Sequence, residues 1–242
     1  MTDLMDYTTY LDQRMKREGP KRKGERTRDR LKVAASELLN EESYQELRIT
    51  DICDRAGIAP GTFYLHYENK QILTIEILSE YVEMWTDLSS QTTADIDDDG
   101  DMFEAIYHTN LIYIQLAQLN PGLTRCVLQI SDIEPEFAAF VHATSSQVYA
   151  RTVAAIAKRT RLPSSPLLLL TINALGSMMD DIVRRLFVMR DPHLNSCISE
   201  MKMSTEDLAK HLTMIWYRSI FGEDPALNPN PAPKGRRKSP NT

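Results

Sequence analysis

The sequence predicts an all-α protein. Apolar residues recur at helical spacing along most of the chain, few Val, Ile or Thr residues alternate with polar ones, and no Asn-Gly or Asp-Gly pair marks a hairpin turn. The 242 residues suffice for one large domain or two modest ones. With 42% hydrophobic and 26% charged residues, the composition is that of a globular protein.

The N-terminal third predicts three helices after a polar arm. Residues 1–25 are polar and charged and are expected to form a flexible basic arm. Apolar residues at i, i+3, i+4 and i+7 predict a helix at about Arg26–Asn40. Two short helices are expected at Ile49–Ala56 and Pro60–Tyr67, because Gly57 separates them and a proline suits only a first helical turn.

The remainder predicts longer helices separated by prolines. Asn69 is a good N-cap for a helix that runs to about Ser90, where an acidic stretch containing Gly100 follows. Residues 224–242 are rich in Pro, Asn and basic residues and are predicted to be disordered. Apolar periodicity predicts further helices at Met102–Leu119, Leu123–Ser131, Pro135–Thr160, Pro166–Met189 and Ser204–Phe221.

Charge is distributed unevenly, although the formal net charge is -6. Basic residues concentrate between Arg14 and Lys32, whereas acidic residues outnumber basic ones from Gln71 onward. A basic N-terminal segment on an acidic body suggests an end that meets a polyanion. A solvated, disordered tail would show the same pattern.

The stretch from Arg48 to Lys70 contains the most informative pattern. Gly57 can take the left-handed conformation of a sharp turn, and Ile58 is expected to fill the corner between the two short helices. Pro60 and Gly61 then begin a second helix with small residues. Small residues at a helix end allow it to approach base edges in the major groove of DNA.

Residues Arg26 to Leu78 closely resemble the DNA-binding domain of the TetR family. The resemblance rests on the positions Ala35 to Leu39, Asp51-Ile52-Cys53, Ala56-Gly57-Ile58-Ala59, Gly61-Thr62-Phe63-Tyr64, His66-Tyr67 and Lys70. It implies a three-helix helix-turn-helix domain at residues 26–70 and a larger helical ligand-binding and dimerisation domain at residues 71–223. The sequence departs from the family pattern at three positions, which bear on DNA sequence preference: Arg48, Ala59 and Tyr67.

The resemblance also implies which residues contact DNA. Pro60, Gly61 and Thr62 would face bases, and Thr50 would reach a base or a phosphate. Tyr64, His66 and Lys70 would hold the backbone, with simple packing as the alternative for each aromatic side chain. The predicted DNA-binding set is completed by Lys21, Arg22 and Lys23 as a minor-groove arm, and by Arg48 and Tyr67.

The C-terminal domain is predicted with less detail. Apolar stripes on the last two predicted helices suit the four-helix dimer interface that the family resemblance implies, and an intramolecular core is the alternative. An apolar effector pocket would lie among the middle helices, although ordinary core packing is the alternative for each member. The candidate pocket residues are Trp85, Phe103, Tyr107, Tyr113, Met178 and Met179.

Nothing in the sequence predicts catalysis, a cofactor or a metal site. The chain has no G-x-S-x-G, H-E-x-x-H, P-loop or dinucleotide-binding glycine pattern. Cys53, Cys126 and Cys197 lie far apart, which suits the reducing bacterial cytoplasm, and no early apolar run resembles a signal peptide. The acidic run at residues 97–101 lacks the alternating ligands of a calcium loop.

The expected function is that of a dimeric repressor. It would bind a palindromic operator in double-stranded DNA and leave it when a small hydrophobic or amphipathic effector binds. One alternative is a helical ligand-binding or protein-interaction module that does not engage DNA. Another is an activator or corepressor-dependent regulator of the same fold.

Overall fold

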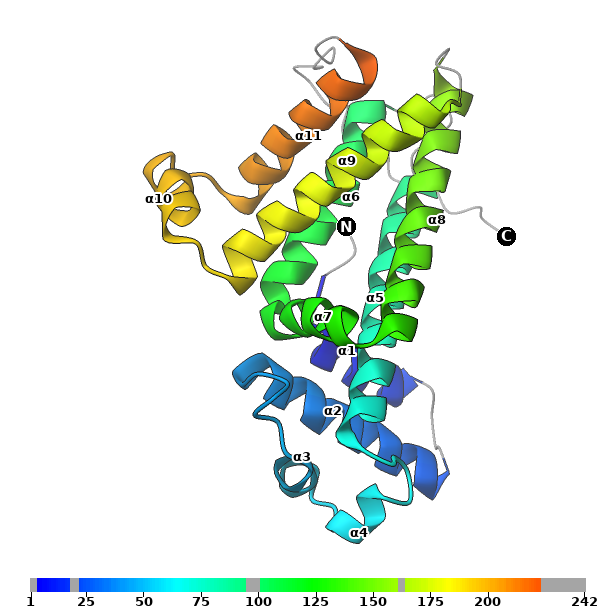
Figure 1. Ribbon diagram of the computed structural model, residues 1–242, viewed down its shortest axis with the longest axis vertical. Helices are drawn as coiled ribbons and strands as arrows, with labels where there is room; N and C mark the ends of the chain where they lie inside the picture. The colour runs from blue at the N-terminus through cyan, green and yellow to red at the C-terminus, as the bar shows by residue number, and fades with distance from the viewer. Residues whose placement is uncertain (1–3, 18–21, 95–100, 161–163, 223–242) are drawn as a thin grey trace, which may run out of the picture.

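The computed structural model describes residues 4–17, 22–94, 101–160 and 164–222, and these residues form helices without a strand (Figure 1). The predicted disordered tail at residues 224–242 lies outside the described residues. In chain order the elements are α1 (Tyr7–Arg17), α2 (Lys23–Glu41), α3 (Ile49–Ala56), α4 (Pro60–Phe63), α5 (Lys70–Ala94), α6 (Met102–Leu119), α7 (Pro121–Ile133), α8 (Pro135–Arg159), α9 (Pro166–Val183), the π-helical turn η1 (Arg184–Val188), α10 (Pro192–Glu200) and α11 (Thr205–Phe221). The all-α prediction is confirmed.

Two apolar clusters divide the molecule along its long axis. One joins α1, α2, α3 and α4 to the first half of α5 and to α7, and its largest buried members include Phe63, Leu73 and Ile77. The other lies among α6, α8, α9 and α11, around Ile172, Leu212 and neighbouring side chains. Figure 1 shows the first group of helices at the lower end and the second at the upper end, so we call the first cluster the lower cluster and the second the upper cluster. Helix α5 extends from the lower group into the upper one.

The N-terminal segment is not a flexible arm where it is described. Tyr7 and Leu11 lie one helical turn apart on α1 and are fully buried against the lower cluster. The Tyr7 backbone N–H donates to Oδ1 of Asn120 at 2.7 Å, which joins α1 to the α6–α7 turn. The prediction of a flexible arm over residues 1–25 is therefore wrong for Tyr7–Arg17. Two buried side chains in a polar stretch were too weak a periodic signal to predict this helix.

Element boundaries differ from prediction at several places. Helix α2 begins at Lys23 rather than Arg26, and α4 ends at Phe63 rather than Tyr67. The sequence analysis missed α10, where the Asp191 carboxylate accepts hydrogen bonds from the backbone N–H groups of His193 and Leu194. An Asp followed by Pro is a good N-cap and first-turn pair, so the signal was present in the sequence.

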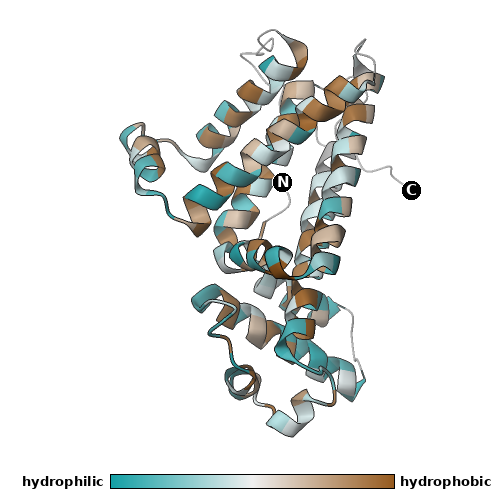
Figure 2. Cartoon of the chain, in the orientation of Figure 1, coloured by the Kyte–Doolittle hydropathy of each residue, from teal (hydrophilic) through white to brown (hydrophobic). Residues whose placement is uncertain are grey.

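Helix α9 is the most apolar long helix of the upper bundle. With η1 it forms the segment Pro166–Val188, which is long and apolar enough to cross a membrane by length and composition, with 33% of its most apolar window buried. One face of α9 packs into the upper cluster through Ile172 and Met179. Figure 2 shows apolar stretches along α9, and Leu167 and Leu170 on this helix are exposed. The buried face identifies α9 as a core helix of the bundle.

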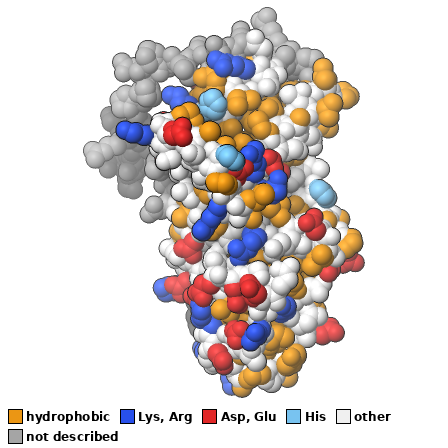
Figure 3. Space-filling view, turned by 60° about the vertical axis from the view of Figure 1, so that its left-hand side comes forward, with side chains coloured by type: hydrophobic (Ala, Val, Ile, Leu, Met, Phe, Trp, Pro, Cys, Tyr) orange, Lys and Arg blue, Asp and Glu red, His pale blue; other side chains and the backbone are white. Residues whose placement is uncertain are grey.

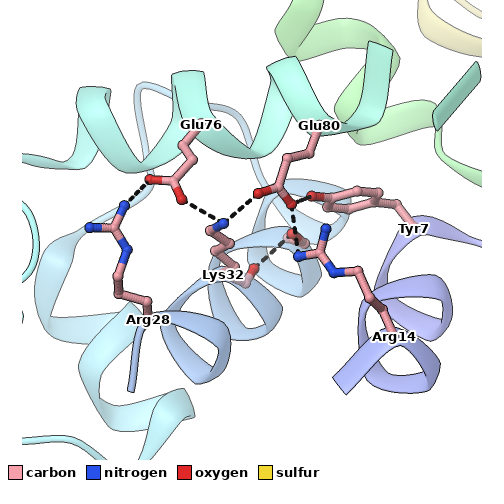
Figure 4. A network of polar contacts seen from close by, with 7 residues as sticks. Tyr7, Arg14, Arg28, Lys32, Glu76 and Glu80 are labelled. Carbon is pink, nitrogen blue, oxygen red and sulfur yellow. Dashed lines mark hydrogen bonds and ion pairs between the residues drawn. The ribbon is translucent and has the colours of Figure 1, made fainter. Parts of the chain in front are cut away.

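A network of charged side chains connects α2, α5 and α1 (Figure 4). The Lys32 ammonium is almost completely buried and contacts Oε1 of both Glu76 and Glu80 at 2.5 Å. Glu80 also accepts hydrogen bonds from the Tyr7 hydroxyl at 2.9 Å and from Arg14 at 3.1 Å. Arg28 binds the other oxygen of Glu76. We call these six residues the α2–α5 ion-pair network.

The pKa of Glu80 shows the balance of forces in this network. Burial alone would raise that pKa, but the hydrogen bond and charge of Lys32, together with Arg14, hold it below its ordinary value. Glu80 is therefore ionised in the folded protein. Its stabilising contribution is present above the pKa that a glutamate has in the unfolded chain, and it is lost as the pH falls through the lower, folded-state pKa.

Replacing Lys32 with Met should destabilise the protein by about 3 kcal/mol, because two partly buried carboxylates then lose the cation between them. Urea denaturation at pH 7 measures this change in unfolding free energy. A matched control is Lys16→Ala, which removes an exposed pair with Asp12 and should cost about 0.5 kcal/mol or less. Equal effects of the two substitutions would contradict the importance of the network.

Candidate nucleic-acid interface and ligand cavity

The turn between α3 and α4 has the geometry that the sequence predicted. Gly57 lies in the left-handed region at φ 61° and ψ 45°, where it ends α3. The Ile58 N–H donates to the Cys53 carbonyl at 2.9 Å, and the Ile58 side chain packs against the lower cluster. Arg30, which the sequence analysis did not select, donates from α2 to the carbonyls of Ala56 and Gly57. Arg30 therefore fixes the turn from outside it.

Helix α4 is short and presents small residues outward. Its N-cap Ala59 provides no side-chain cap, and Pro60 occupies the first turn, where its missing N–H costs nothing. A Cβ on Gly61 would meet nothing within 4 Å. Phe63 is fully buried, so it holds the helix against the core while the opposite side stays open. Figure 1 places α4 at the lower extremity of the molecule.

Two exposed side chains follow this small-residue tip. Tyr64 is 60% exposed and Leu65 is 81% exposed. The Tyr64 ring packs edge-on against Phe63 at 5.5 Å between centroids. Leu65 was not among the predicted DNA contacts. An apolar side chain so exposed beside a polar tip is unusual, and a thymine methyl group is one partner it could contact.

The other predicted DNA contacts divide by exposure. Arg22, Lys23, Arg48 and Thr50 are exposed, whereas Thr62 and His66 are half-buried. A Cβ on Gly24 would lie 3.6 Å from Cε1 of His66, so the start of α2 adjoins the α4 region. Arg22 and Lys23 therefore lie near the same end of the molecule as α4. Lys21 lies outside the described residues.

Lys70 has a role other than the phosphate contact expected of it. Its ammonium donates to the carbonyls of Tyr44 at 2.9 Å, Gln45 at 3.3 Å and Leu47 at 2.7 Å. An ammonium has three N–H donors, so these bonds use all of them. Partial burial lowers the pKa of Lys70. In this structure Lys70 orders the loop between α2 and α3, and Asn69 caps α5 as predicted, by accepting from the Ile72 N–H.

Tyr67 and Arg48 also depart from simple expectations. The Tyr67 ring is buried, and the Arg28 guanidinium lies over it at 4.7 Å from the ring centroid. Arg48 is the N-cap of α3, and no side chain caps this helix. The Thr50 hydroxyl in the first turn contacts the Asp51 carboxylate.

Much of the basic N-terminal stretch faces inward. Arg14, Arg28 and Lys32 belong to the α2–α5 ion-pair network. They hold helices together rather than meeting a polyanion. The sequence could not distinguish them from Arg22 and Lys23, because charge alone does not show which basic residues have a carboxylate partner far along the chain.

A cavity of about 460 Å³ lies among α5, α6, α7, α8 and α9, with Trp216 of α11 also in its wall. Its surface is mainly apolar, and its size is typical of sites that enclose a small molecule. The aromatic and acidic residues that line it are Tyr81, Trp85, Tyr113, Tyr149, Trp216 and Asp180. The chain has two tryptophans, and both line this cavity.

The cavity includes half of the predicted pocket residues. Trp85, Tyr113 and Met179 line it. Phe103 and Tyr107 do not: Tyr107 packs against the second apolar cluster, and the Phe103 ring contacts Tyr217 of α11 at 6.0 Å between centroids. Met178 packs against the second cluster, next to the lining Met179.

Some cavity residues were missing from the prediction. Asp180 and Tyr149 are polar-tipped side chains on helices whose partners the sequence does not specify. A charged residue inside the apolar pattern of Pro166–Met189 was the available signal for Asp180. No local signal distinguishes Tyr149 from an ordinary surface tyrosine.

The structure combines an exposed short helix, which follows a left-handed glycine turn, with a larger helical bundle that contains a cavity. This combination defines the class of helix-turn-helix DNA-binding proteins with a separate ligand domain. Residues 32–77 match the family described as bacterial regulatory proteins, tetR family. The match covers the helix-turn-helix region, and the chain is a DNA-binding transcriptional regulator.

Relatives and solved structures agree with this assignment. The chain is 22% identical over 195 residues to the HTH-type transcriptional regulator EthR of Mycolicibacterium smegmatis, which covers 80% of this chain and 85% of the relative. It is 33% identical over 66 residues to the fatty acid metabolism regulator protein of Bacillus subtilis, or 25% of this chain and 34% of that protein.

Among solved structures, a transcriptional regulator from Rhodococcus superposes with a TM-score of 0.62 at 15% identity, covering 83% of this chain and 99% of that one. The regulator FadR of Bacillus subtilis, in complex with stearoyl-CoA, superposes with a TM-score of 0.58 at 14% identity, covering 80% of this chain and 98% of that one. At these identities the likeness establishes the fold.

Gly57→Ala should destabilise the protein by about 1 kcal/mol, because an L side chain is strained at this positive φ. The added methyl group would also approach Arg30 to 3.0 Å. Gly61→Ala is the matched control, since its Cβ enters open space on a helix, and its stability should be unchanged or slightly higher. Thermal denaturation of both variants measures the difference, and a Gly57→Ala variant as stable as Gly61→Ala would contradict the strained turn.

Proposed function

We propose that this regulator is a dimeric repressor that inserts the α4 tip of each protomer into successive major grooves of a palindromic operator. The open space at Gly61 supports this proposal most directly. A backbone without side chains in front of it can approach base edges to hydrogen-bonding distance, with Thr62 beside it. Residues 26–70 would read DNA, and residues 71–223 would bind effector and pair the protomers.

The remaining predicted contacts have matching places in this proposal. Tyr64 and Arg48 are exposed near the tip and suit phosphate contacts, as does half-buried His66. The α2 start would bring Arg22 and Lys23 toward the adjacent minor groove. Lys70 would act indirectly, by ordering the loop before α3.

The exposed face of α9 supports the dimer. Leu167 is 72% exposed and Leu170 is 66% exposed on a helix whose other face is core. Figure 3, which brings the side of α9, α10 and α11 forward, shows apolar side chains gathered on the upper part of this face. A second copy related by a two-fold axis would cover them, and would space two α4 tips for half-sites about 34–36 Å apart.

Contacts between α7 and α2 support release by an effector. The Tyr81 hydroxyl, in the cavity wall, lies 3.1 Å from Oγ1 of Thr124 on α7. Arg125, the next residue, donates to the carbonyls of Leu39 at 3.1 Å and Glu42 at 2.6 Å, at the end of α2. A ligand that displaces α7 would therefore displace α2 and the attached turn.

Close packing makes this connection short. The Gly122 N–H donates to Oδ1 of Asn40 at 3.2 Å, and a Cβ on Gly122 would lie 2.1 Å from the Leu39 carbonyl oxygen. The backbones of α7 and α2 thus touch, so little movement of α7 can be absorbed between them. The same contacts would serve an activator or a corepressor-dependent regulator; effector titration of DNA binding separates these.

Tyr64→Ala and Arg48→Ala should each reduce affinity for DNA upstream of the protein's own coding sequence by about tenfold, corresponding to about 1.4 kcal/mol for a lost phosphate contact. Affinity should also fall steeply with added salt, because phosphate contacts release counterions. Fluorescence anisotropy with a labelled duplex measures both effects. Lys16→Ala is the control, because Lys16 is exposed on α1 and pairs with Asp12.

A wild-type protein that binds this DNA no more tightly than unrelated DNA at moderate salt would overturn the proposal for that site. Unchanged affinity in both variants would overturn the placement of the interface. In the first case the helical module without DNA binding becomes the better account.

Leu170→Asp should convert the dimer to monomer, because it places a charge in the covered face of α9. Light scattering coupled to size-exclusion chromatography measures the mass. Ile133→Asp is the matched control, since Ile133 is 58% exposed at the end of α7, away from α9 and α11. A monomeric wild type, or a dimer that both substitutions leave intact, would contradict this interface.

A further inference from the structure

The cavity wall is mainly apolar and aromatic and contains one acidic side chain, Asp180. Asp180 lies on α9 and accepts a hydrogen bond at Oδ1 from the Tyr113 hydroxyl, at 2.5 Å. Asp180 retains exposed surface although helices surround it, so part of the carboxylate faces the hollow. Burial raises its pKa and the Tyr113 hydrogen bond lowers it. The net effect is a pKa of Asp180 above its ordinary value.

Aromatic rings surround this carboxylate. The Tyr113 ring meets Trp85 edge-on at 5.3 Å between centroids. The Tyr149 hydroxyl lies over Gly176, one turn before Asp180, and a Cβ at Gly176 would be 2.1 Å from it. Gly176 thus makes room for Tyr149 beside the acid. Burial is the larger cause of a raised pKa for both tyrosine hydroxyls, and the negative charge of Asp180 raises it further.

The cavity wall also contains two basic residues, Arg151 and Arg184, whose contacts are with groups other than Asp180. Arg151 donates to Oγ of Ser90 at 2.7 Å. Arg184 pairs with Asp181, which does not line the cavity, and its other nitrogen contacts Sδ of Met189. Neither arginine pairs with Asp180, although the guanidinium of Arg151 adds a positive charge elsewhere in the wall. The negative charge in the hollow is therefore not neutralised by these two cations.

A carboxylate ringed by aromatic faces is complementary to an organic cation. The charge attracts the cation, and the π faces of Trp85, Tyr113 and Tyr149 attract it further where water is excluded. An anionic ligand would meet repulsion at the same place. The buried indole N–H groups of Trp85 and Trp216 have no partner in the structure and suit an uncharged oxygen acceptor elsewhere on the ligand.

We infer that the effector is a cationic amphiphile, with an amine seated against Asp180 among Trp85, Tyr113 and Tyr149 and an apolar body filling the remainder of the cavity. This inference rests on the proposal that the cavity binds an effector. It differs from what the name of the stearoyl-CoA complex says of the Bacillus subtilis regulator, because that ligand carries negative charge.

The two tryptophans provide a direct readout, because both line the cavity. Three probes share one chain length and differ in head group: decylamine, decanol and decanoate, each titrated below its micelle concentration at pH 7.5. Decylamine should quench or shift the tryptophan fluorescence with at least tenfold higher affinity than decanol, and decanoate should bind most weakly. The measurement needs no DNA, so it is independent of the operator.

Asp180→Asn retains the side-chain shape and an acceptor for Tyr113 but removes the charge. It should reduce decylamine affinity about tenfold and leave decanol affinity within about twofold. Asp87→Asn is the matched control, since Asp87 is an exposed carboxylate on α5 outside the cavity wall. Circular dichroism and urea denaturation establish that both variants fold.

Tighter binding of decanoate than of decylamine, or an unchanged decylamine preference in Asp180→Asn, would overturn the inference. A response to none of the probes would overturn it as well. Operator binding by the same preparation distinguishes these outcomes from failure of the proposed DNA-binding function, because a protein that binds DNA but rejects amines contradicts only the effector assignment.

Discussion

The arrangement of the whole molecule depends on the Lys32 ammonium held between Glu76 and Glu80. The two carboxylates lie one turn apart on α5, so both can contact one cation from α2 without any change in helix geometry. Hydrophobic packing could hold α2 against α5 at several rotations, since it is not directional. Ion pairs with fixed donors and acceptors select one of them, and so set where the turn and α4 point relative to the bundle.

Helix α5 makes this constraint relevant to regulation. Its first half carries Glu76 and Glu80, and the following turns place Tyr81 and Trp85 in the cavity wall. One rigid helix therefore contacts both the DNA-reading helices and the ligand site. The second connection runs from the cavity through α7 to the end of α2, by way of Arg125 and Gly122. Two connections at separate points on α2 allow a change at the cavity to rotate the lower helices rather than merely loosen them.

The sequence predicted the features that local chemistry determines. Gly57, Asn69 and Pro60 occupy the turn, cap and first-turn positions expected of them, because the conformations they favour depend on their own backbone and nearest neighbours. The family pattern likewise placed the helix-turn-helix correctly, since its residues are contiguous.

What the sequence did not predict depends on partners distant in the chain. Lys70 donates to carbonyls that lie more than 20 positions away along the chain, and Lys32 contacts the Glu80 carboxylate 48 positions away. No local sequence pattern reveals such partners. Phe103 and Tyr107 differ from the lining Tyr113 only in their phase around α6, and that phase is set by how α11 packs. Helix α1 was missed because it is stabilised by buried contacts to α2, α5 and the α6–α7 turn rather than by its own polar sequence.

Selection of duplexes from a random pool by the purified full-length protein tests the central claim most directly, because it assumes no operator. The account predicts enrichment of an inverted repeat whose half-site centres lie about one helical turn, or a multiple of it, apart, with protection in the major groove of each half-site. A pool that shows no enriched sequence, or a single half-site without a symmetric mate, would contradict a protein that presents two α4 tips to DNA.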